Sequence, residues 1–513
     1  MRRRIANGSV GAALVGSVMA LGLVSAPAAA PASGAAAAAG THYYVDCAAG
    51  NDSAAGTSEG TAWRTLAKAS SKVFAPGDTL RLRGGTTCQG TLAPQGSGSA
   101  SAPVTVKSYG TGTARIDGAG ASAAVLLHNV QYYELKNLTV TNTGAAGAAR
   151  RAGIRVLLED YGVGHHYVVS GVTVRDVNGT DDRYPNPSGG ILFEAAGSSV
   201  PTGFSDVKVT NDQVTHVDRT GIGMTSDWQK RSENPNGPGS SFVSNEGVVI
   251  ERNNVTDTGG DGIVVFNGSK ARVAHNTVDG FNMRSADYNV GAFAWNSDNT
   301  VFEHNTVRHG KYPGVAFAVE GGNIGTVYEY NYSQDNAGGF LYFCQADGEI
   351  TKNGVVRYNI SQNDAAGAKD FGLISSYCTG VSNLRVYQNT FYAPNAPSIS
   401  KVGQSNGLSL QNNIFVGRPG GSTFDDPYGS YKGNLYSNVA ALPAHQANSV
   451  TGDPKLTAPG TGISASDATG YRLKAGSPAL NAGSRISNDG GRDFYGNPVP
   501  AVPNIGAYQG AAQ

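Results

Sequence analysis

Two kinds of short apolar segment alternate between residues 245 and 415 of the chain. One begins with Gly and continues as an apolar run, as in Gly-Ile-Val-Val-Phe (262–266). The other alternates apolar and polar positions up to an Asn, as in Phe-Glu-His-Asn-Thr-Val (302–307), and this Asn recurs every 23 to 30 residues. Short strands repeating at this period, with no helical pattern between them, are typical of stacked-repeat proteins. The pattern therefore predicts a β-solenoid with two strands in each repeat.

The recurring Asn residues are expected to form a hydrogen-bonded ladder at one corner, because stacked coils bring equivalent positions to about 4.8 Å from one another. Asn331 and Asn359 also fit glycosylation sequons, but their periodicity favours the ladder. The marked positions are Asn253, Asn276, Asn305, Asn331, Asn359, Asn389 and Asn412.

The amino-acid composition is compatible with this architecture. Gly accounts for 71 of 513 residues, which suits a chain that turns at every corner of a coil. Charged residues make up 15% of the chain and their formal charges cancel to zero. Such a balance predicts no nucleic-acid partner and no anionic membrane surface, although a local basic groove stays possible.

The N-terminus has the features of an export signal. Three Arg residues follow Met1, an apolar stretch runs to about Val24, and Ala-Pro-Ala-Ala-Ala (26–30) resembles a cleavage site. We expect residues 1–30 to be a signal peptide and residues 31–40 a disordered linker, so the mature protein is expected to be secreted. A membrane anchor is the weaker interpretation, because the apolar run is short and is broken by Gly and Ser.

Four cysteines fit an exported protein with two disulfides. Cys47 and Cys88 lie in the N-terminal region, where a bond would pin the start of the solenoid. Cys344 and Cys378 end apolar strands of successive coils, which places their side chains near each other. There is no CxxC motif, and the spacing suits no zinc site.

The repeat also sets the expected boundaries. Three stretches break its rhythm, and insertions of this kind often build a binding site on one face; they are 143–167, 178–188 and 229–244. The expected domains are an N-terminal cap (41–103), a β-helix (104–435) and a closing segment (436–513).

Three features carry a resemblance to a known group of proteins: the paired segments, the entry formed by Trp63 and Gly77-Asp78, and the closing Asn-Ile-Gly-Ala-Tyr (504–508). Through them, the chain resembles secreted bacterial right-handed parallel β-helix proteins of the pectate-lyase-like superfamily over roughly residues 41–510. The resemblance implies an all-β, right-handed parallel β-helix. That superfamily includes polysaccharide lyases, glycoside hydrolases, epimerases and non-enzymatic tailspikes and adhesins, and no one family's catalytic signature carries over to this chain.

The outward face of the Gly-initiated strands offers carboxylates. Aligned on their first Gly, these strands place Glu194, Trp295 and Ala318 in one row, with Asp227 and Glu320 two residues further on. Paired carboxylates beside aromatic rings suit hydrolysis of a glycosidic bond, where one acid protonates the leaving oxygen and the other acts as base or nucleophile. The candidate catalytic residues are Asp227, Asp261, Asp298 and Glu320.

Spacing separates these candidates. Asp227 and Glu320 lie three coils apart, about 14 Å, which exceeds the separation of either an inverting or a retaining pair. Asp298 and Glu320 lie on neighbouring coils near the same strand end, so a close pair is expected there. Asp261 in Gly-Gly-Asp-Gly and Asp298 in Asn-Ser-Asp-Asn can also be simple turn residues.

Aromatic and basic side chains near this face are expected to bind substrate. Trp295, on an outward register, is expected to stack on a sugar ring, although it can instead cover a side loop. The candidate substrate-binding residues are Trp228, Tyr288, Trp295, Tyr342, Arg308 and Lys311.

Two other functions remain open at this point. A lyase acting by β-elimination on a uronate polymer would use Arg308 or Lys311 as its base, and calcium is the cofactor that this alternative allows. A non-catalytic glycan-binding or surface protein is the third interpretation. The near-absence of clustered basic residues favours the hydrolase, for which we expect a monomer, a polysaccharide substrate and no cofactor.

Overall fold

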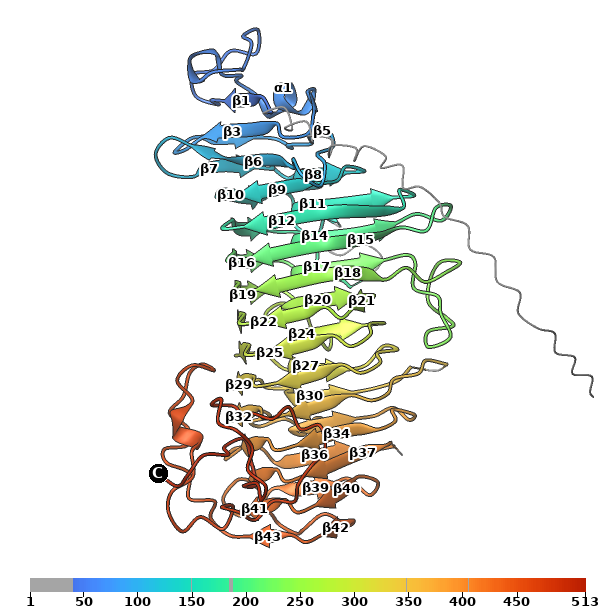
Figure 1. Ribbon diagram of the computed structural model, residues 1–513, viewed down its shortest axis with the longest axis vertical. Coiled ribbons are helices and arrows are strands. Elements are labelled where there is room, and N and C mark those ends of the chain that lie inside the picture. The colour runs from blue at the N-terminus through green and yellow to red at the C-terminus, as the bar shows by residue number, and fades with distance from the viewer. Residues whose placement is uncertain (1–39, 149, 184–187, 347, 405) are drawn as a thin grey trace, which may run out of the picture. The chain divides into compact units, whose positions relative to one another are not determined.

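The computed structural model of the protein describes residues 40–148, 150–183, 188–346, 348–404 and 406–513. The expected signal peptide (1–30), and the linker up to residue 39, lie outside the described residues. Regular structure in the described part is almost entirely strand. The exceptions are α1 (Leu66–Ser70), η1 (Glu59–Thr61) and η2 (Thr469–Tyr471). The chain winds in coils that stack from β1 to β43, and each coil adds strands to three parallel sheets (Figure 1).

Sheet I contains 16 strands in the described residues. In stacking order they are β1 (His42–Val45), β3 (Thr79–Arg83), β6 (Val104–Tyr109), β9 (Tyr133–Lys136), β12 (Val163–Ser170), β15 (Gly203–Thr210), β18 (Asn245–Glu251), β22 (Arg272–Ala274), β25 (Val301–Glu303), β28 (Val327–Glu329), β31 (Val355–Arg357), β34 (Leu384–Tyr387), β37 (Leu408–Gln411), β40 (Ser430–Lys432) and β42 (Gln446–Ala447), with β21 (Gly268–Ser269) paired to β18.

Sheet II contains 14 strands in the same part of the chain. They are β4 (Thr87–Gln89), β7 (Ala114–Asp117), β10 (Leu138–Asn142), β13 (Thr173–Val177), β16 (Gln213–Val217), β19 (Asn254–Thr258), β23 (Thr277–Asp279), β26 (Thr306–Arg308), β29 (Tyr332–Gln334), β32 (Ile360–Gln362), β35 (Thr390–Tyr392), β38 (Ile414–Val416), β41 (Leu435–Ser437) and β43 (Val450–Thr451).

Sheet III, which carries the candidate site, contains 11 strands among the described residues. They are β8 (Ala123–His128), β11 (Ala152–Glu159), β14 (Gly189–Ala196), β17 (Thr220–Ser226), β20 (Ile263–Phe266), β24 (Val290–Trp295), β27 (Val315–Val319), β30 (Gly339–Phe343), β33 (Ile374–Ser376), β36 (Ser398–Val402) and β39 (Thr423–Asp425). A separate pair joins β2 (Val73–Phe74) to β5 (Gln95–Gly96).

The predicted parallel β-helix is confirmed, but each coil contributes to three sheets rather than two. The Asn-containing segment forms two strands, because the residue before the Asn adopts a left-handed backbone conformation. His275, His304 and Tyr330 have φ values of 56°, 53° and 57° at this corner. The chain therefore bends there, and β25 passes into sheet I while β26 passes into sheet II. Inward Val, Ile, Leu and aromatic side chains from all three sheets fill the core.

The predicted Asn ladder is confirmed at this corner. The Nδ2 atoms of Asn253, Asn276, Asn305 and Asn331 each donate to the Oδ1 atom of the next Asn at 3.0 Å. Each of these side chains also donates to a backbone carbonyl, and all are buried. Burial of Asn331 and Asn359 leaves no room for the alternative reading of these two as exposed glycosylation sites.

The ladder differs from the predicted one at its ends. Asn389 bonds to Asn413, not to Asn412, and Asn413 continues to Asn434. Asn412 instead occupies the left-handed corner position and donates to the Ser484 carbonyl at 2.7 Å. Where two Asn residues are adjacent, the sequence does not show which of them belongs to the ladder. An alignment shifted by one residue exchanges the corner position for the inward position.

Both predicted disulfides are present. Cys47 and Cys88 join the first coils with a Cα–Cα distance of 5.3 Å, and Cys344 and Cys378 join the ends of β30 and β33 at 5.1 Å. The sheets extend beyond the expected limits of the β-helix. Sheet I already begins at β1, inside the expected cap, and sheets I and II end at β42 and β43.

The C-terminal residues pack along sheet II beside the later coils (Figure 1). Tyr471 donates to the Gln362 side chain at 2.5 Å, and the Ala507 amide donates to Thr390 at 3.0 Å. The outward face of sheet III is not covered by this segment. Among the described residues, no helix is both long enough and apolar enough to span a bilayer.

Candidate active site

A cavity of about 610 Å³ lies on the outward face of sheet III. Its floor comes from β14, β17, β20 and β24, and it extends to the residue after β27. Five carboxylates and three arginines line it together with apolar and aromatic side chains. The charged lining residues are Glu194, Asp227, Asp261, Glu320, Glu349, Arg150, Arg183 and Arg219.

One outward row of sheet III crosses the centre of this cavity. Glu194 pairs with Thr225, and Phe266 pairs with Trp295. The register between β24 and β27, continued by one residue, places Glu320 beside Trp295. The expected alignment put Ala318 in that position and was wrong by two residues. Its anchor, Gly314, precedes the paired part of β27, so the first Gly of a segment is not a reliable register mark.

Glu320 is the most strongly perturbed carboxyl in the cavity. Only 8% of the residue is exposed. Burial raises its pKa to about 8; Arg183 opposes this shift, while the charges of Asp261 and Glu349 add to it. A carboxyl in this environment stays protonated at neutral pH and can donate a proton.

Tyr288 lies beside Glu320. Its hydroxyl is buried and makes no hydrogen bond that satisfies ordinary geometry with another described residue. Burial, followed by the charge of Glu320, raises the pKa of this phenol well above its usual value. Tyr288 therefore remains a neutral donor beside Glu320, although it is not itself one of the residues that line the cavity.

Asp261 forms an ion pair with Arg219 at the opposite end of the strands. Its Oδ2 atom accepts from Arg219, and its Oδ1 atom accepts from the Val290 amide at 2.8 Å. Arg219 also donates to Asn289 at 2.5 Å. The cavity therefore holds a carboxyl with a raised pKa, Glu320, together with a second carboxyl, Asp261, that is paired with an arginine.

Asp227 also lines the cavity, as expected, but it is exposed, and its Oδ2 atom accepts from the Gly197 amide at 3.1 Å. Asp298 does not line the cavity. It forms an ion pair with Arg231 at 2.7 Å and a strand bridge with Ser269. The expected close pair of Asp298 and Glu320 is therefore absent, because Asp298 has passed the corner that leads out of sheet III.

Two carboxylates in the cavity were not selected from sequence. Glu194 forms an ion pair with Arg155 at 2.5 Å. It shares the outward row with Trp295, so the row itself was the signal that could have identified it. Glu349 is 8% exposed, and burial raises its pKa. It lies in an irregular segment after β30, where no periodic signal existed.

The tryptophans differ in position. Trp295 lines the cavity and stacks on Phe266 with ring centroids 6.1 Å apart, while its indole lies against Gly321. A Cβ atom at Gly321 would meet this ring at 2.3 Å, so only glycine fits beneath it. Trp228 is 0% exposed and belongs to the core, so it is not available as a sugar platform.

The other expected binding residues lie outside the cavity. Tyr342 packs against Tyr288 with ring centroids 4.8 Å apart, next to the cavity on the outward face of sheet III. Arg308 belongs to sheet II, where it forms an ion pair with Asp279 at 2.9 Å. Lys311 is exposed in the turn after β26 and donates to the Met283 carbonyl. These two basic groups are therefore not positioned at the site.

The insertion at 229–244 builds one wall, as its irregular sequence suggested, and in Figure 1 the loop between β17 and β18 extends beside the following coils. Arg231 anchors it by donating to Asn296 at 2.8 Å and to the Gly322 carbonyl at 2.8 Å, in addition to its ion pair with Asp298. The Ile350 amide donates to the Glu233 carbonyl at 2.9 Å. A loop from one coil thereby covers strands several coils away.

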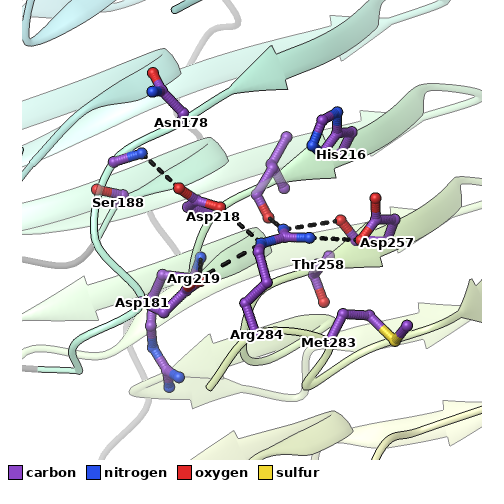
Figure 2. A network of polar contacts seen from close by, with 12 residues as sticks. Asn178, Asp181, Ser188, His216, Asp218, Arg219, Asp257, Thr258, Met283 and Arg284 are labelled. Carbon is purple, nitrogen blue, oxygen red and sulfur yellow. Dashed lines mark hydrogen bonds and ion pairs between the residues drawn. The ribbon is translucent and has the colours of Figure 1, made fainter. Parts of the chain in front are cut away.

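Figure 2 shows a polar network around Arg284, which precedes Tyr288 by four residues in the chain. The Arg284 guanidinium contacts Asp218 at 2.8 Å and Asp257 at 2.6 Å, and it donates to the Val217 carbonyl at 2.6 Å. Asp181 accepts from the Arg219 amide at 2.9 Å. Burial is the largest cause of the raised pKa of Asp181. Through Asp181 and Arg284, the network links the 178–188 insertion and the segment before β24 to sheet II.

Within the described part of the chain, no group of three or more His, Cys, Asp or Glu side chains is arranged to hold an ion.

By fold, the chain is a right-handed parallel β-helix protein. The family model described as "Right handed beta helix region" matches residues 231–367. A lacto-N-biosidase of Bifidobacterium longum is 28% identical, over 92% of this chain and 36% of that protein. The chain thus spans little more than a third of the length of this relative.

Two solved structures share the fold. The GH136 lacto-N-biosidase of Eubacterium ramulus has a TM-score of 0.58 at 20% identity, covering 80% of this chain and 67% of the other. XylC in complex with xylose has a TM-score of 0.51 at 11% identity, covering 92% and 99%. At these identities, the likenesses establish the architecture alone.

Proposed function

We propose that the protein is a glycoside hydrolase that cleaves glycosidic bonds of an oligosaccharide or polysaccharide in the cavity on sheet III. The carrying observation is Glu320, a buried carboxyl with a pKa of about 8, in the same cavity as Asp261, which is paired with Arg219. The lacto-N-biosidase that aligns with 92% of this chain supports the same class of reaction.

Glu320 is the proposed general acid. Its neutral form donates a proton to the glycosidic oxygen as the bond breaks, and its raised pKa keeps that proton available at neutral pH. Asp261 is the proposed second carboxyl, acting as base or nucleophile. It is paired with Arg219, and the stereochemistry of the product distinguishes the two roles.

The cavity also supports a proposal about the size of the bound unit. Its volume of about 610 Å³ lies in the range of small-ligand sites, so we expect it to hold one or two sugar units rather than a long segment. Phe266, Phe293 and Trp295 supply apolar surface, while Asp227 and Glu194 can accept hydrogen bonds from sugar hydroxyls.

The β-elimination alternative loses its proposed base. Arg308 and Lys311 lie on or beside sheet II, not in the cavity. We further propose that the protein acts outside the cell as a monomer. The N-terminal sequence pattern and the two disulfides support export.

The proposal is tested by assaying the full protein on a panel of natural oligosaccharides, polysaccharides and aryl glycosides, with and without calcium. We expect new reducing ends without the absorbance of an unsaturated uronate. Glu320→Gln should lower kcat/KM by about 10²–10⁴, the usual contribution of a general acid, without lowering the thermal midpoint. Asp261→Asn should also lower kcat/KM.

Glu246→Gln is the matched control, because Glu246 is an exposed carboxylate on β18 outside the cavity. Formation of unsaturated uronate products would show that the protein is a lyase and not a hydrolase. Glycan binding without any cleavage would support a non-catalytic protein. Full activity in Glu320→Gln would remove Glu320 from the mechanism.

A further inference from the structure

An aromatic patch continues the outward face of sheet III beyond the cavity, and it consists of Tyr312, Tyr342, Phe371 and Tyr377. Phe371 is central, with ring-centroid distances of 6.1 Å to Tyr312, 5.9 Å to Tyr342 and 5.8 Å to Tyr377. Tyr312 and Tyr377 stand nearly perpendicular to Phe371, at 75° and 74°. The patch is therefore a corrugated surface of connected rings.

This patch is accessible. Tyr377 is 46% exposed and Tyr312 is 36% exposed, and both contact Phe371, so the exposed rings form one connected patch of the kind that marks interaction sites. The C-terminal segment packs on sheet II and does not cover them.

The patch is continuous with the site. Tyr288, which lies beside Glu320, contacts Tyr342 at 4.8 Å and Phe371 at 6.1 Å between ring centroids. In the sheet, Tyr342 pairs with Ala318 on the coil of Glu320 and with Ser375 on the following coil. A ligand that leaves the cavity along the stacking direction would therefore meet these rings next.

Polar groups lie at the edge of the patch. Asp370 is exposed and accepts from the Tyr312 hydroxyl at 2.8 Å, and Lys401 pairs in the sheet with Ser375, beyond Tyr342. Aromatic rings bordered by hydrogen-bonding groups suit a glycan, whose ring faces are apolar and whose edges carry hydroxyls. A purely apolar partner would remove water from these polar groups without offering them hydrogen bonds in return.

The patch is also held in place. Tyr377 directly precedes Cys378, whose disulfide to Cys344 ties the end of β33 to the end of β30. The Asn406 side chain donates to the Cys378 carbonyl at 2.8 Å. A ring fixed in this way loses little conformational freedom when it binds a ligand.

From these observations we propose that Tyr312, Phe371 and Tyr377 form a second glycan-binding subsite, which holds sugar units on the far side of the cleaved bond. The inference rests on the proposed function and deepens it. It makes the substrate a chain that extends past the cavity toward the C-terminal coils, and not an isolated disaccharide.

The test compares a short substrate with a long one. For Tyr377→Ala and Tyr312→Ala, kcat/KM on a long oligosaccharide should fall about tenfold for each ring removed, the factor that corresponds to about 1.4 kcal/mol. On an aryl glycoside that fills only the cavity, kcat/KM should stay within about twofold of wild type, since the patch does not contact that substrate.

Two control variants separate ring stacking from general damage. Tyr377→Phe keeps the ring and should retain the activity on the long substrate. Tyr428→Ala removes a tyrosine of similar exposure, 45%, outside the patch, and should leave both substrates unaffected. Equal losses on the short and long substrates in Tyr377→Ala, or no loss on the long one, would overturn the subsite.

A binding measurement keeps this inference separate from the proposed function. Affinity electrophoresis or calorimetry with long oligosaccharides is carried out on Glu320→Gln, alone and combined with Tyr377→Ala. Weaker glycan binding in the double variant supports the subsite even if no hydrolysis is ever detected. Unchanged glycan binding, with a change of molecular mass in sedimentation, would instead make the patch a contact between copies and overturn the proposal.

Discussion

Glu320 shows how a single residue acquires its chemistry from its surroundings. Nothing in Val-Glu-Gly-Gly distinguishes it from a turn residue. In the folded chain, burial penalises its charged form, and the negative charges of Asp261 and Glu349 add to that penalty. A neutral carboxyl in a cavity lined with acceptors and aromatic rings is suited to donate a proton.

This environment predicts a dependence on pH. Because the folded pKa of Glu320 is raised from 4.5 to about 8, stabilisation by its neutral form is complete below about pH 4.5 and is lost as the pH rises through about 8. The thermal midpoint of the wild type should therefore fall, relative to Glu320→Gln, between pH 5 and pH 9. The associated free energy is at most about 1.4 kcal/mol for each pH unit.

The kcat/KM of the wild type should decline over the alkaline part of the same range, since the proton is needed for catalysis. Thermal melts and initial rates across this range measure both effects. Parallel melting profiles for the two proteins would show that Glu320 is not held neutral.

At the scale of elements, the corner between sheets I and II depends on the Asn ladder. Each ladder side chain bonds to the next coil and to a backbone carbonyl, so every coil connects to its neighbours by buried polar contacts. Buried amides with complete hydrogen bonding fix one register, because a slipped coil would leave them unsatisfied.

Asn305→Ala should therefore destabilise the protein by about 1–3 kcal/mol. It removes the acceptor of the Asn276 side chain and the donor to the Val273 carbonyl, and leaves both groups buried. Chemical denaturation measures the change. Asn395→Ala is the control, because Asn395 is an exposed amide outside the ladder and should change stability by less than about 0.5 kcal/mol. Equal effects of the two substitutions would contradict a special role for the ladder.

At the scale of the whole β-helix, coils contact mainly their neighbours, so a disulfide is expected to stabilise mainly the coils that it joins. The Cys344–Cys378 bond joins successive strands of sheet III next to the aromatic patch, and the Cys47–Cys88 bond joins the first coils. Each disulfide should thus protect its own region rather than the entire stack.

Replacing Cys344 and Cys378 together by Ser should lower the free energy of unfolding by about 2–4 kcal/mol, the typical contribution of a native disulfide. Hydrogen exchange should accelerate mainly in β30 and β33, and little in the coils near β3 and β6. Faster exchange spread evenly along the chain would show that the coils unfold as one cooperative unit.

Much of this architecture could be predicted from the sequence. The Gly- and Asn-containing segments predicted stacked strands, a ladder and the Cys344–Cys378 disulfide, because a solenoid turns sequence period directly into spatial proximity. The Cys47–Cys88 disulfide was predicted from the even number of cysteines in a chain expected to be exported. The prediction was wrong where local symmetry was ambiguous. It chose Asn412 over the neighbouring Asn413, aligned β27 by a glycine outside the paired strand, and read the bent Asn segment as one strand.

Sequence alone determined that the chain forms a parallel β-helix with carboxylates on one outward face, since both follow from a repeat that each coil satisfies independently. Tertiary structure decided which carboxylates share a cavity, that Asp298 holds a loop and that Trp228 lies in the core. The physical reason is that the site depends on non-periodic insertions. Their contacts across several coils determine how deeply each carboxyl is buried and which charges lie near it. The repeat in the sequence contains no information about those contacts.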